Sequence, residues 1–209
     1  MLVDMHLHEK TFSSDAKHEL KEIVEVAKAR GLDAICITDH DSMGLKDFAE
    51  QYSKKINFPI FVGVEFFSLQ GDITAFGIDS IPEERVDAQT FIDYVLLQGG
   101  VCFSCHPFRN NNRGLEENLK SVKGLTGIEV LNGSTSQAAN KMAFEYCTEL
   151  QLMPIGASDA HDLEQVGKYV TWLPNMVYNL NDFVAEIKKG ISKPAMLGDN
   201  RYTLLDFLE

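Results

Sequence analysis

Residues 1–40 read MLVDMHLHEKTFSSDAKHELKEIVEVAKARGLDAICITDH, and they contain two apolar runs around an amphipathic segment. The runs MLVDMHLH and DAICITDH are rich in β-forming residues and predict two strands. Between them, residues 18–30 repeat apolar side chains at helical spacing, and Gly31 ends the pattern. The stretch is therefore a strand–helix–strand unit, which is typical of α/β folds.

The rest of the chain continues this alternation. Further strands are expected at 59–68, 73–78, 101–107, 127–133, 153–161 and 169–174, and further helices at 43–55, 83–98, 136–150 and 180–189. Mostly apolar strands separated by helices favour a parallel sheet. About seven strands in this pattern suit a barrel or distorted barrel. No linker or repeat divides the chain, so we expect one domain over 1–209, with its motifs in 1–175 and a C-terminal segment at 176–209.

The charge balance is acidic, with 19 Lys and Arg against 31 Asp and Glu and a formal net charge of −12. This balance disfavours non-specific binding to nucleic acid or to an anionic membrane, because both need a basic face. The sequence contains no apolar run of about 18 residues, so no membrane span is expected. The N-terminus lacks the features of a signal peptide, so we expect a cytoplasmic protein. The sequence carries no signal for an oligomeric state.

The four cysteines are Cys36, Cys102, Cys105 and Cys147. Without a secretory signal they are expected to be reduced. Cys102 and Cys105 have CxxC spacing, but residues three apart on a strand point to opposite faces. Core packing is therefore favoured over a zinc or redox role for this pair.

Polar side chains recur where the expected strands end. Five of the six histidines and several acids lie there: His6, His8, His40, His106, His161, Asp39, Glu65 and Asp159. The carboxyl ends of barrel strands meet on one face. A lone buried histidine usually needs only a hydrogen-bond partner, but recurrence at successive strand ends favours metal binding. Imidazoles and carboxylates are ligands of zinc, manganese and iron.

The ordered motifs HxH, SSD, TDH, GVE, CHP and SDAH resemble those of the PHP (polymerase and histidinol phosphatase) superfamily over residues 1 to about 175. The resemblance implies a distorted (β/α)7 barrel, two or three divalent metal ions and, for many members, phosphoesterase activity. The implied ligands are His6, His8, Glu65 and Asp159 for a first metal, Glu65 and His106 for a second, and Asp15, His40 and His161 for a third.

Two positions leave alternatives open. Asp15 also suits the N-cap of the following helix. Thr74 stands where the family usually has a histidine ligand of the second metal. That site is then completed by water or substrate phosphate, is weak, or is absent. Four further polar residues are interpreted as supporting or lining the site: Asp4, Asp39, Glu129 and Asn132.

Clustered divalent metals suit phosphoester hydrolysis, because they generate a bound hydroxide and neutralise the phosphoryl oxygens. Candidate catalytic groups for proton transfer are His161, Asp159 and His40. Candidate substrate-binding cations are Arg109, Arg113 and Lys10. For the two arginines the alternative is a solvated polar loop.

We therefore predict a metal-dependent phosphoesterase that acts on a small phosphorylated molecule, either a monoester or a diester. One alternative is an amidohydrolase-type enzyme, since amidohydrolase barrels also carry HxH on their first strand. Another is a metal-binding domain without activity. The TDH and SDAH motifs favour the first prediction over the amidohydrolase, and the near-complete ligand set argues against an inactive domain.

Overall fold

The computed structural model describes residues 1–199 and 201–205, which contain eleven strands, five α-helices and one short 3-10 helix. The strands are β1 (Leu2–Asp4), β2 (Ala34–Ile37), β3 (Ile60–Val62), β4 (Val64–Phe67), β5 (Asp72–Phe76), β6 (Val101–Ser104), β7 (Gly127–Asn132), β8 (Met153–Ala157), β9 (Tyr169–Trp172), β10 (Lys193–Leu197) and β11 (Tyr202–Leu204). The helices are α1 (Leu20–Ala29), α2 (Lys46–Ile56), α3 (Ala88–Leu97), η1 (Glu116–Lys120), α4 (Gln137–Leu150) and α5 (Leu180–Ile187). None of the helices described is long and apolar enough to cross a membrane.

Three helices begin at polar caps that the sequence supplies. The side chains of Asp87, Ser136 and Asn179 each accept a hydrogen bond from a backbone N–H in the first turn of α3, α4 and α5. Such caps satisfy donors that a helix start otherwise leaves unpaired. The caps place the start of α4 and α5 where the sequence patterns predict them, whereas α3 begins later than expected.

The strands form two sheets, and the predicted distorted (β/α)7 barrel is wrong. One sheet has the order β11-β10-β9-β1-β2-β3, and the other has the order β4-β5-β6-β7-β8. Across the described ranges the sheets do not close into one barrel. Isolated bridges between Leu7 and Ala160 and between His40 and Glu65 connect them. The fold is therefore a mixed α/β arrangement of parallel and antiparallel strands.

Short connections explain this departure. Parallel neighbours need a crossover of a dozen or more residues, usually with a helix. Only residues 68–71 join β4 to β5, so these strands pair antiparallel. No helix separates β8 from β9, and β9 pairs antiparallel with β1. The β10–β11 hairpin lies in the C-terminal segment, after the helix predicted at 180–189.

The expected strand at 59–68 also breaks, and Gly63 is the point of the break. β3 before it belongs to one sheet and β4 after it to the other. A Cβ atom at Gly63 would lie 2.3 Å from the carbonyl oxygen of Ala75. Only glycine allows this close approach, so the residue fixes where the chain passes from one sheet to the other.

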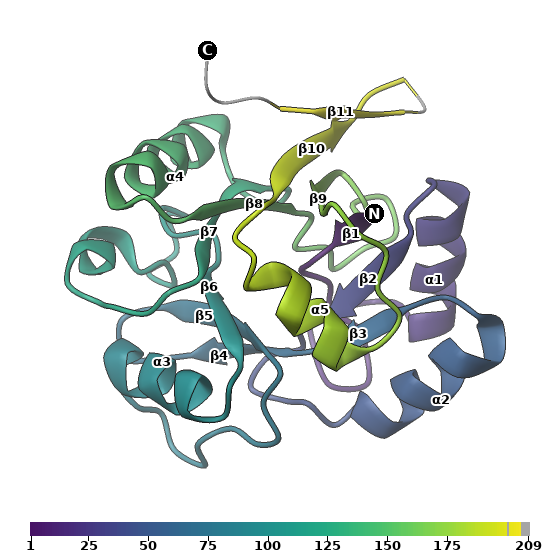
Figure 1. The fold of residues 1–209 in the computed structure, drawn as a ribbon, viewed down its shortest axis with the longest axis horizontal. Coiled ribbons are helices and arrows are strands. Elements are labelled where there is room, and N and C mark those ends of the chain that lie inside the picture. Colours follow the sequence, from purple (N-terminus) through teal and green to yellow (C-terminus); the bar gives the residue numbers. More distant parts are fainter. Residues whose placement is uncertain (200, 206–209) are drawn as a thin grey trace.

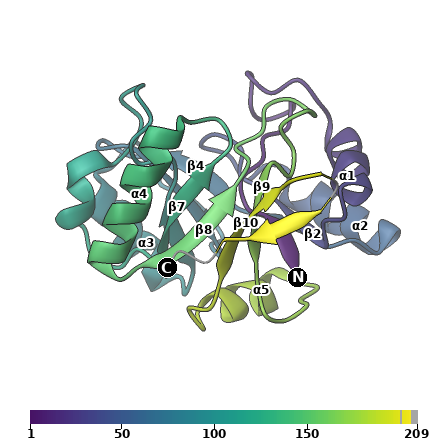
Figure 2. The ribbon, with the colours of Figure 1, turned by 90° about the horizontal axis from the view of Figure 1, so that it is seen from above.

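An apolar core fills the space between the sheets, and α5 closes one end of it. Phe183 of α5 stacks on Phe61 of β3 with 4.5 Å between ring centroids, and it meets Phe76 of β5 edge-on at 5.5 Å. Helices α1 and α2 lie beside the first sheet, and α3 and α4 lie beside the second (Figures 1 and 2). Since β5 runs from Asp72 to Phe76, Asp72 lies at the end away from α5.

Candidate metal centre

Four donor atoms from both sheets meet beyond the carboxyl end of β1. His6 Nε2 lies 3.0 Å from His8 Nε2. Each of these nitrogens lies 3.4 to 3.6 Å from Glu65 Oε2 and from Asp159 Oδ1. Ligands about 2.1 Å from a tetrahedral ion stand about 3.4 Å apart. These five distances are close to the separation of ligands around a tetrahedral ion.

The two carboxylates direct unpartnered oxygens to this point. Glu65 Oε2 and Asp159 Oδ1 are buried and accept no hydrogen bond from the described residues. His40 Nδ1 approaches Glu65 Oε2 at 2.7 Å, but the pair is not aligned as a hydrogen bond. Buried charged oxygens without donors are costly, so a cation is the partner that this donor set fits.

Buried contacts orient the two histidines. His6 Nδ1 lies 2.7 Å from Glu129 Oε1, and His8 Nδ1 lies 3.2 Å from Ser13 Oγ. Ser13 in turn donates to Asp39 Oδ1 at 2.8 Å. Each ring therefore directs Nε2 to the donor cluster, as is usual for metal-binding histidines. Glu129 and Asp39 lie where supporting residues are expected.

The protonation states of three of the four donors, His8, Glu65 and Asp159, suit a cation. Burial lowers the pKa of His8 to about 4, so this imidazole is neutral at pH 7. Burial alone would raise the pKa values of Glu65 and Asp159, but the charge of His6 and contacts with nearby imidazoles hold both well below their usual range. A metal needs neutral imidazoles and ionised carboxylates.

His6 differs from His8 in its proton balance. Burial alone would lower the pKa of His6, but the charges of Glu129, Asp159 and Glu65 raise it well above its usual value. A metal ligand at Nε2 must be free of a proton there. Binding of an ion at His6 is therefore expected to release a proton.

Asp15, His40 and His161 form a separate group on the exposed side of the four donor atoms. Asp15 Oδ2 lies 3.2 Å from His40 Nε2 and 3.3 Å from His161 Nε2. His40 and His161 both stack on His8, with ring centroids 4.4 and 4.2 Å away. The structure thus brings together the three residues that the resemblance assigns to a third metal. Asp15 is not a helix cap, because α1 begins only after Glu19.

His106, Glu65 and Asp72 form another group, which contains the two residues that the resemblance assigns to the second metal. His106 Nε2 lies 2.8 Å from Glu65 Oε1 and 3.8 Å from Asp72 Oδ2. Thr74 is buried, and its hydroxyl lies 3.5 Å from the carbonyl oxygen of Phe103. Asp72 is not among the predicted ligands, although alternation along the strand places it on the same face as Thr74.

Two predicted ligands have unusual backbone conformations. His106 has φ of 32° and Asp159 has φ of 52°, both in the left-handed region. Such conformations cost free energy in residues other than glycine and need local support. The amide of His106 donates to Glu129 Oε2 at 3.0 Å, and Ser134 Oγ donates to the carbonyl oxygen of Asp159 at 2.8 Å. These bonds hold both residues in conformations that direct their side chains to the cluster.

Arg109 lies directly beside the four donor atoms. Its Nη2 donates to Asp159 Oδ2 and, at 3.0 Å, to Asn132 Oδ1. Its Nε is buried and has no partner among the residues described. Asn132 also donates to Glu129 Oε2 at 2.8 Å. Arg109 and Asn132 therefore lie at the wall of the cluster.

The other two predicted cations are paired. Arg113 donates from Nε to Asp72 Oδ2 at 2.6 Å and from Nη2 to Asp72 Oδ1 at 2.8 Å. Lys10 Nζ lies 2.9 Å from Glu19 Oε1, just before α1. Arg113 is thus next to the group of His106, Glu65 and Asp72, whereas Lys10 has its contact at the start of α1.

Asp4 and Cys105 lie at the edges of the site. Asp4 is buried and accepts from the amides of Ser158 at 3.0 Å and Gly167 at 2.7 Å, which ties β1 to the chain after β8. The four cysteines are buried and unpaired. Cys105 Sγ lies 3.5 Å from Glu65 Oε1, a contact that the core-packing interpretation does not include.

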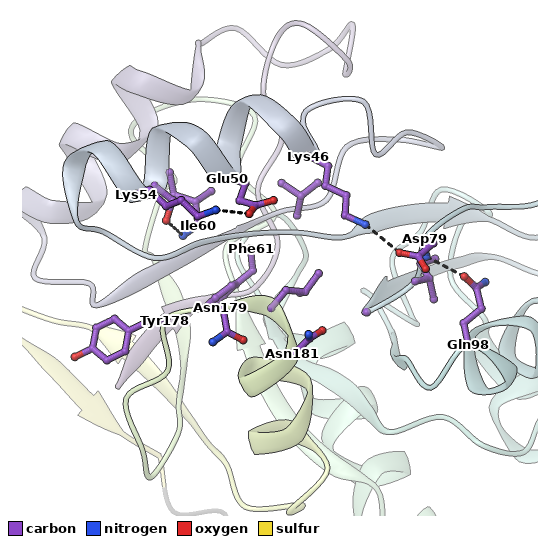
Figure 3. A pocket seen from close by; sticks show the side chains of 15 residues that line it. Lys46, Glu50, Lys54, Ile60, Phe61, Asp79, Gln98, Tyr178, Asn179 and Asn181 are labelled. Atoms are coloured by element: carbon purple, nitrogen blue, oxygen red, sulfur yellow. Dashed lines mark hydrogen bonds and ion pairs between the residues drawn. The ribbon is translucent and has the colours of Figure 1, made fainter.

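A cavity of about 470 Å³ opens elsewhere, between α2, β3 and the start of α5 (Figure 3). Its charged side chains are paired with one another: Lys46 with Asp79 and Lys54 with Glu50. None of the predicted site residues lines it. The candidate site is therefore the histidine–carboxylate cluster at the other end of the core.

Comparisons with known proteins agree with the motifs. A family model described as PHP-associated matches residues 137–191, which contain Asp159 and His161. An uncharacterized protein of Methanocaldococcus jannaschii is 23% identical over 141 residues, which are 63% of this chain and 82% of that protein.

Two solved structures share the fold. A Bifidobacterium adolescentis protein, provisionally described as a metal-dependent phosphoesterase, has a TM-score of 0.67 and 20% identity, with 90% of this chain and 96% of that chain covered. A lesion-specific endonuclease from Pyrococcus furiosus has a TM-score of 0.67 and 15% identity, with 97% of this chain and 57% of that chain covered. Since one of the similar structures is an endonuclease, the expectation from net charge that nucleic-acid binding is disfavoured is not supported. The match of the PHP-associated model at residues 137–191 agrees with the resemblance of the motifs to the PHP superfamily, and the similar structures show that the fold is shared.

Proposed function

We propose that the protein is a metal-dependent phosphoesterase that hydrolyses a small phosphorylated substrate at the histidine–carboxylate cluster. The observation that carries this proposal is the spacing of His6, His8, Glu65 and Asp159 around two unpartnered carboxylate oxygens. The similar structures support a phosphoesterase-type hydrolase at the level of the family and leave the substrate open.

Divalent ions at such a site supply charge that activates water and neutralises the phosphoryl and leaving oxygens. The residues proposed to hold them are His6, His8, Glu65 and Asp159 for one ion, Asp15, His40 and His161 for another, and Glu65 with His106 for a further one. Mixed imidazole and carboxylate donors suit zinc, manganese and iron.

Arg109 is the best-placed residue for binding the phosphoryl group. Its guanidinium is largely buried and is held by Asp159 and Asn132. The unpartnered Nε is a buried donor, which is costly without an acceptor. A phosphoryl oxygen supplies that acceptor, and guanidinium groups bind such oxygens strongly.

Proton transfer to the leaving group needs a side chain that reaches both the cluster and solvent. The side chains of His40 and His161 are 26% and 23% exposed, whereas that of Asp159 is 1% exposed and paired with Arg109. Of these three residues, whichever of His161 and His40 is not bound to an ion is therefore the stronger proton-transfer candidate. Asp159 is better suited to holding an ion.

The test is a hydrolysis screen with metal-loaded protein. p-Nitrophenyl phosphate, bis(p-nitrophenyl) phosphate, nucleotides, sugar phosphates and a DNA oligonucleotide separate monoesterase, diesterase and nuclease activity. We expect His8→Ala to abolish both hydrolysis and binding of one ion. His18→Ala is the matched control, because His18 pairs with Glu22 and Asp162 outside the cluster.

Two outcomes would contradict the proposal. Metal-loaded protein that hydrolyses amides but no phosphoester would indicate an amidohydrolase-type enzyme. Metal-loaded protein that is inert on the whole panel would indicate a metal-binding domain.

A further inference from the structure

Asp72 is a buried carboxylate that the expected ligand sets leave unused. Its Oδ2 lies 3.8 Å from His106 Nε2, and that nitrogen lies 2.8 Å from Glu65 Oε1. Donor atoms of Glu65, Asp72 and His106 all lie within 4.8 Å of one another, and all three side chains are buried. Glu65 directs its other oxygen to His6 and His8, so the Asp72 group lies on the opposite side of the Glu65 carboxylate.

Asp72 and Thr74 share one face of β5, because side chains alternate along a strand. Thr74 pairs in register with Glu65, but its hydroxyl lies 3.5 Å from the carbonyl oxygen of Phe103. A threonine hydroxyl is also a poor donor to a divalent ion compared with a carboxylate. Asp72 is therefore the residue of β5 that presents a charged donor to His106.

Arg113 holds the Asp72 carboxylate in place. Its Nε and Nη2 donate to the two carboxylate oxygens at 2.6 and 2.8 Å. Its guanidinium also stacks on Phe67, 4.3 Å from the ring centroid, and Arg85 lies 3.8 Å from the same centroid. A carboxylate oxygen can accept more than one partner, so Oδ2 keeps a lone pair for a cation while Arg113 holds it. Ligating carboxylates commonly have such a hydrogen-bonded support.

We propose that Asp72 is a ligand of the second metal ion, together with Glu65 and His106, and that Arg113 is a positioning residue for Asp72. This inference rests on the proposed metal centre and departs from the histidine that the resemblance implies at position 74. The second site then has one imidazole and two carboxylates, whereas the first has two of each. A donor set richer in oxygen favours Mn²⁺ over Zn²⁺ relative to the first site.

The first experiment counts ions in the wild type and in Asp72→Asn. Metal-free protein is titrated with Mn²⁺, and free Mn²⁺ is followed by electron paramagnetic resonance. We expect the variant to bind one ion fewer, or to bind its weakest ion at least about tenfold less tightly. Arg113→Lys keeps the positive charge but loses the paired guanidinium donors that hold both oxygens of Asp72. It is expected to weaken the binding of the same ion only. Asp79→Asn is the matched control, because the Asp79 side chain is 98% exposed.

The second experiment is a rescue. Thr74→His in the Asp72→Asn background adds an imidazole on the same face of β5, and it is expected to restore the lost ion with a shift in preference toward Zn²⁺. An unchanged number and affinity of Mn²⁺ ions in a folded Asp72→Asn variant would overturn the proposal.

A third measurement needs no variant, in case Asp72→Asn does not fold. Crystals of the wild type soaked in Mn²⁺ should show an anomalous peak at coordination distance from Glu65, His106 and Asp72. No peak there, or a peak without Asp72 as a ligand, refutes the assignment. These measurements count ions rather than turnover. If the protein hydrolyses phosphoesters but Asp72→Asn does not change Mn²⁺ binding, this inference is wrong and the proposed function stands. If Asp72→Asn loses an ion but the protein hydrolyses no phosphoester, the inference stands and the proposed function is wrong.

Discussion

His6 Nδ1 lies 2.7 Å from Glu129 Oε1, and neither side chain is exposed to solvent. This contact fixes the tautomer of His6, so that Nε2 is directed to the other donors. We expect Glu129→Gln to lower metal affinity at the first site by about 10- to 100-fold without removing a ligand. Isothermal titration of the metal-free protein measures this change.

Glu145→Gln on α4 is the control for that substitution, since the Glu145 side chain is 60% exposed. Equal metal affinities for Glu129→Gln and Glu145→Gln would show that His6 needs no orienting partner.

Arg109 is expected to act on substrate rather than on metal. Arg109→Ala removes the guanidinium with the buried unpartnered Nε. If Arg109 binds the phosphoryl group, kcat/KM on the best phosphoester of the screen falls by about 10²-fold or more, because a charge-assisted bond is lost. Metal content, measured on the same samples by mass spectrometry, is expected to stay unchanged. A loss of bound metal with no separate effect on kcat/KM would contradict the substrate-binding role.

Phe183 is expected to contribute to stability and not to metal binding. Its ring contacts Phe61 and Phe76 at the end of the core closed by α5. Phe183→Ala should lower the free energy of unfolding by about 3 to 5 kcal/mol, as measured by denaturant titration. Phe48→Ala, at a position 50% exposed on α2, should change it by less than about 0.5 kcal/mol. Similar costs for both variants would show that the contacts of Phe183 are not what stabilises this end.

Glu186 is expected to make stability depend on pH at a place remote from the metal centre. Its Oε1 accepts from Asn175 Nδ2 at 2.9 Å, and its Oε2 lies 2.5 Å from Lys189 Nζ. Burial alone would raise the pKa of Glu186, but Lys189 and Asn175 hold it below the ordinary 4.5. The folded state therefore binds this proton less readily than the unfolded state. The stabilisation is present above pH 4.5 and is lost as pH falls below it.

The measurement compares wild type with Glu186→Gln in metal-free protein, so that loss of metal in acid does not contribute. We expect the wild type to be more stable by about 1 kcal/mol at pH 7, with the difference shrinking toward zero in acid. A difference that stays constant from neutral to acid pH would assign the effect to shape rather than to charge.

Local patterns were enough to predict most helices and which polar residues lie close together. Alternation places His6 and His8 on one side of the chain, and the side-chain periodicity that shows this needs no knowledge of strand order. Strand order itself depends on which segments pair over long separations. The barrel prediction was wrong because the link between β4 and β5 is too short for a parallel crossover and no helix lies between β8 and β9.

Residues of the site were missed for different reasons. Asp72, which we propose as a ligand, shares a strand face with Thr74 but was not predicted, because the motif of the resembled family points to position 74. Ser13 had no signal, because a loop serine reveals nothing about the buried histidine that it will contact.

The passage of the chain from one sheet to the other at Gly63 has a thermodynamic consequence. His6, His8 and His40 follow strands of the first sheet, whereas Glu65, His106 and Asp159 belong to or follow strands of the second. An ion bound by both sets would act as a removable cross-link between the two sheets. Its binding adds to the free energy of unfolding, by about 4 kcal/mol when the free ion is at a thousand times its Kd. Chelation should therefore loosen the contact between the sheets before it disturbs the helices, which amide hydrogen exchange can resolve strand by strand.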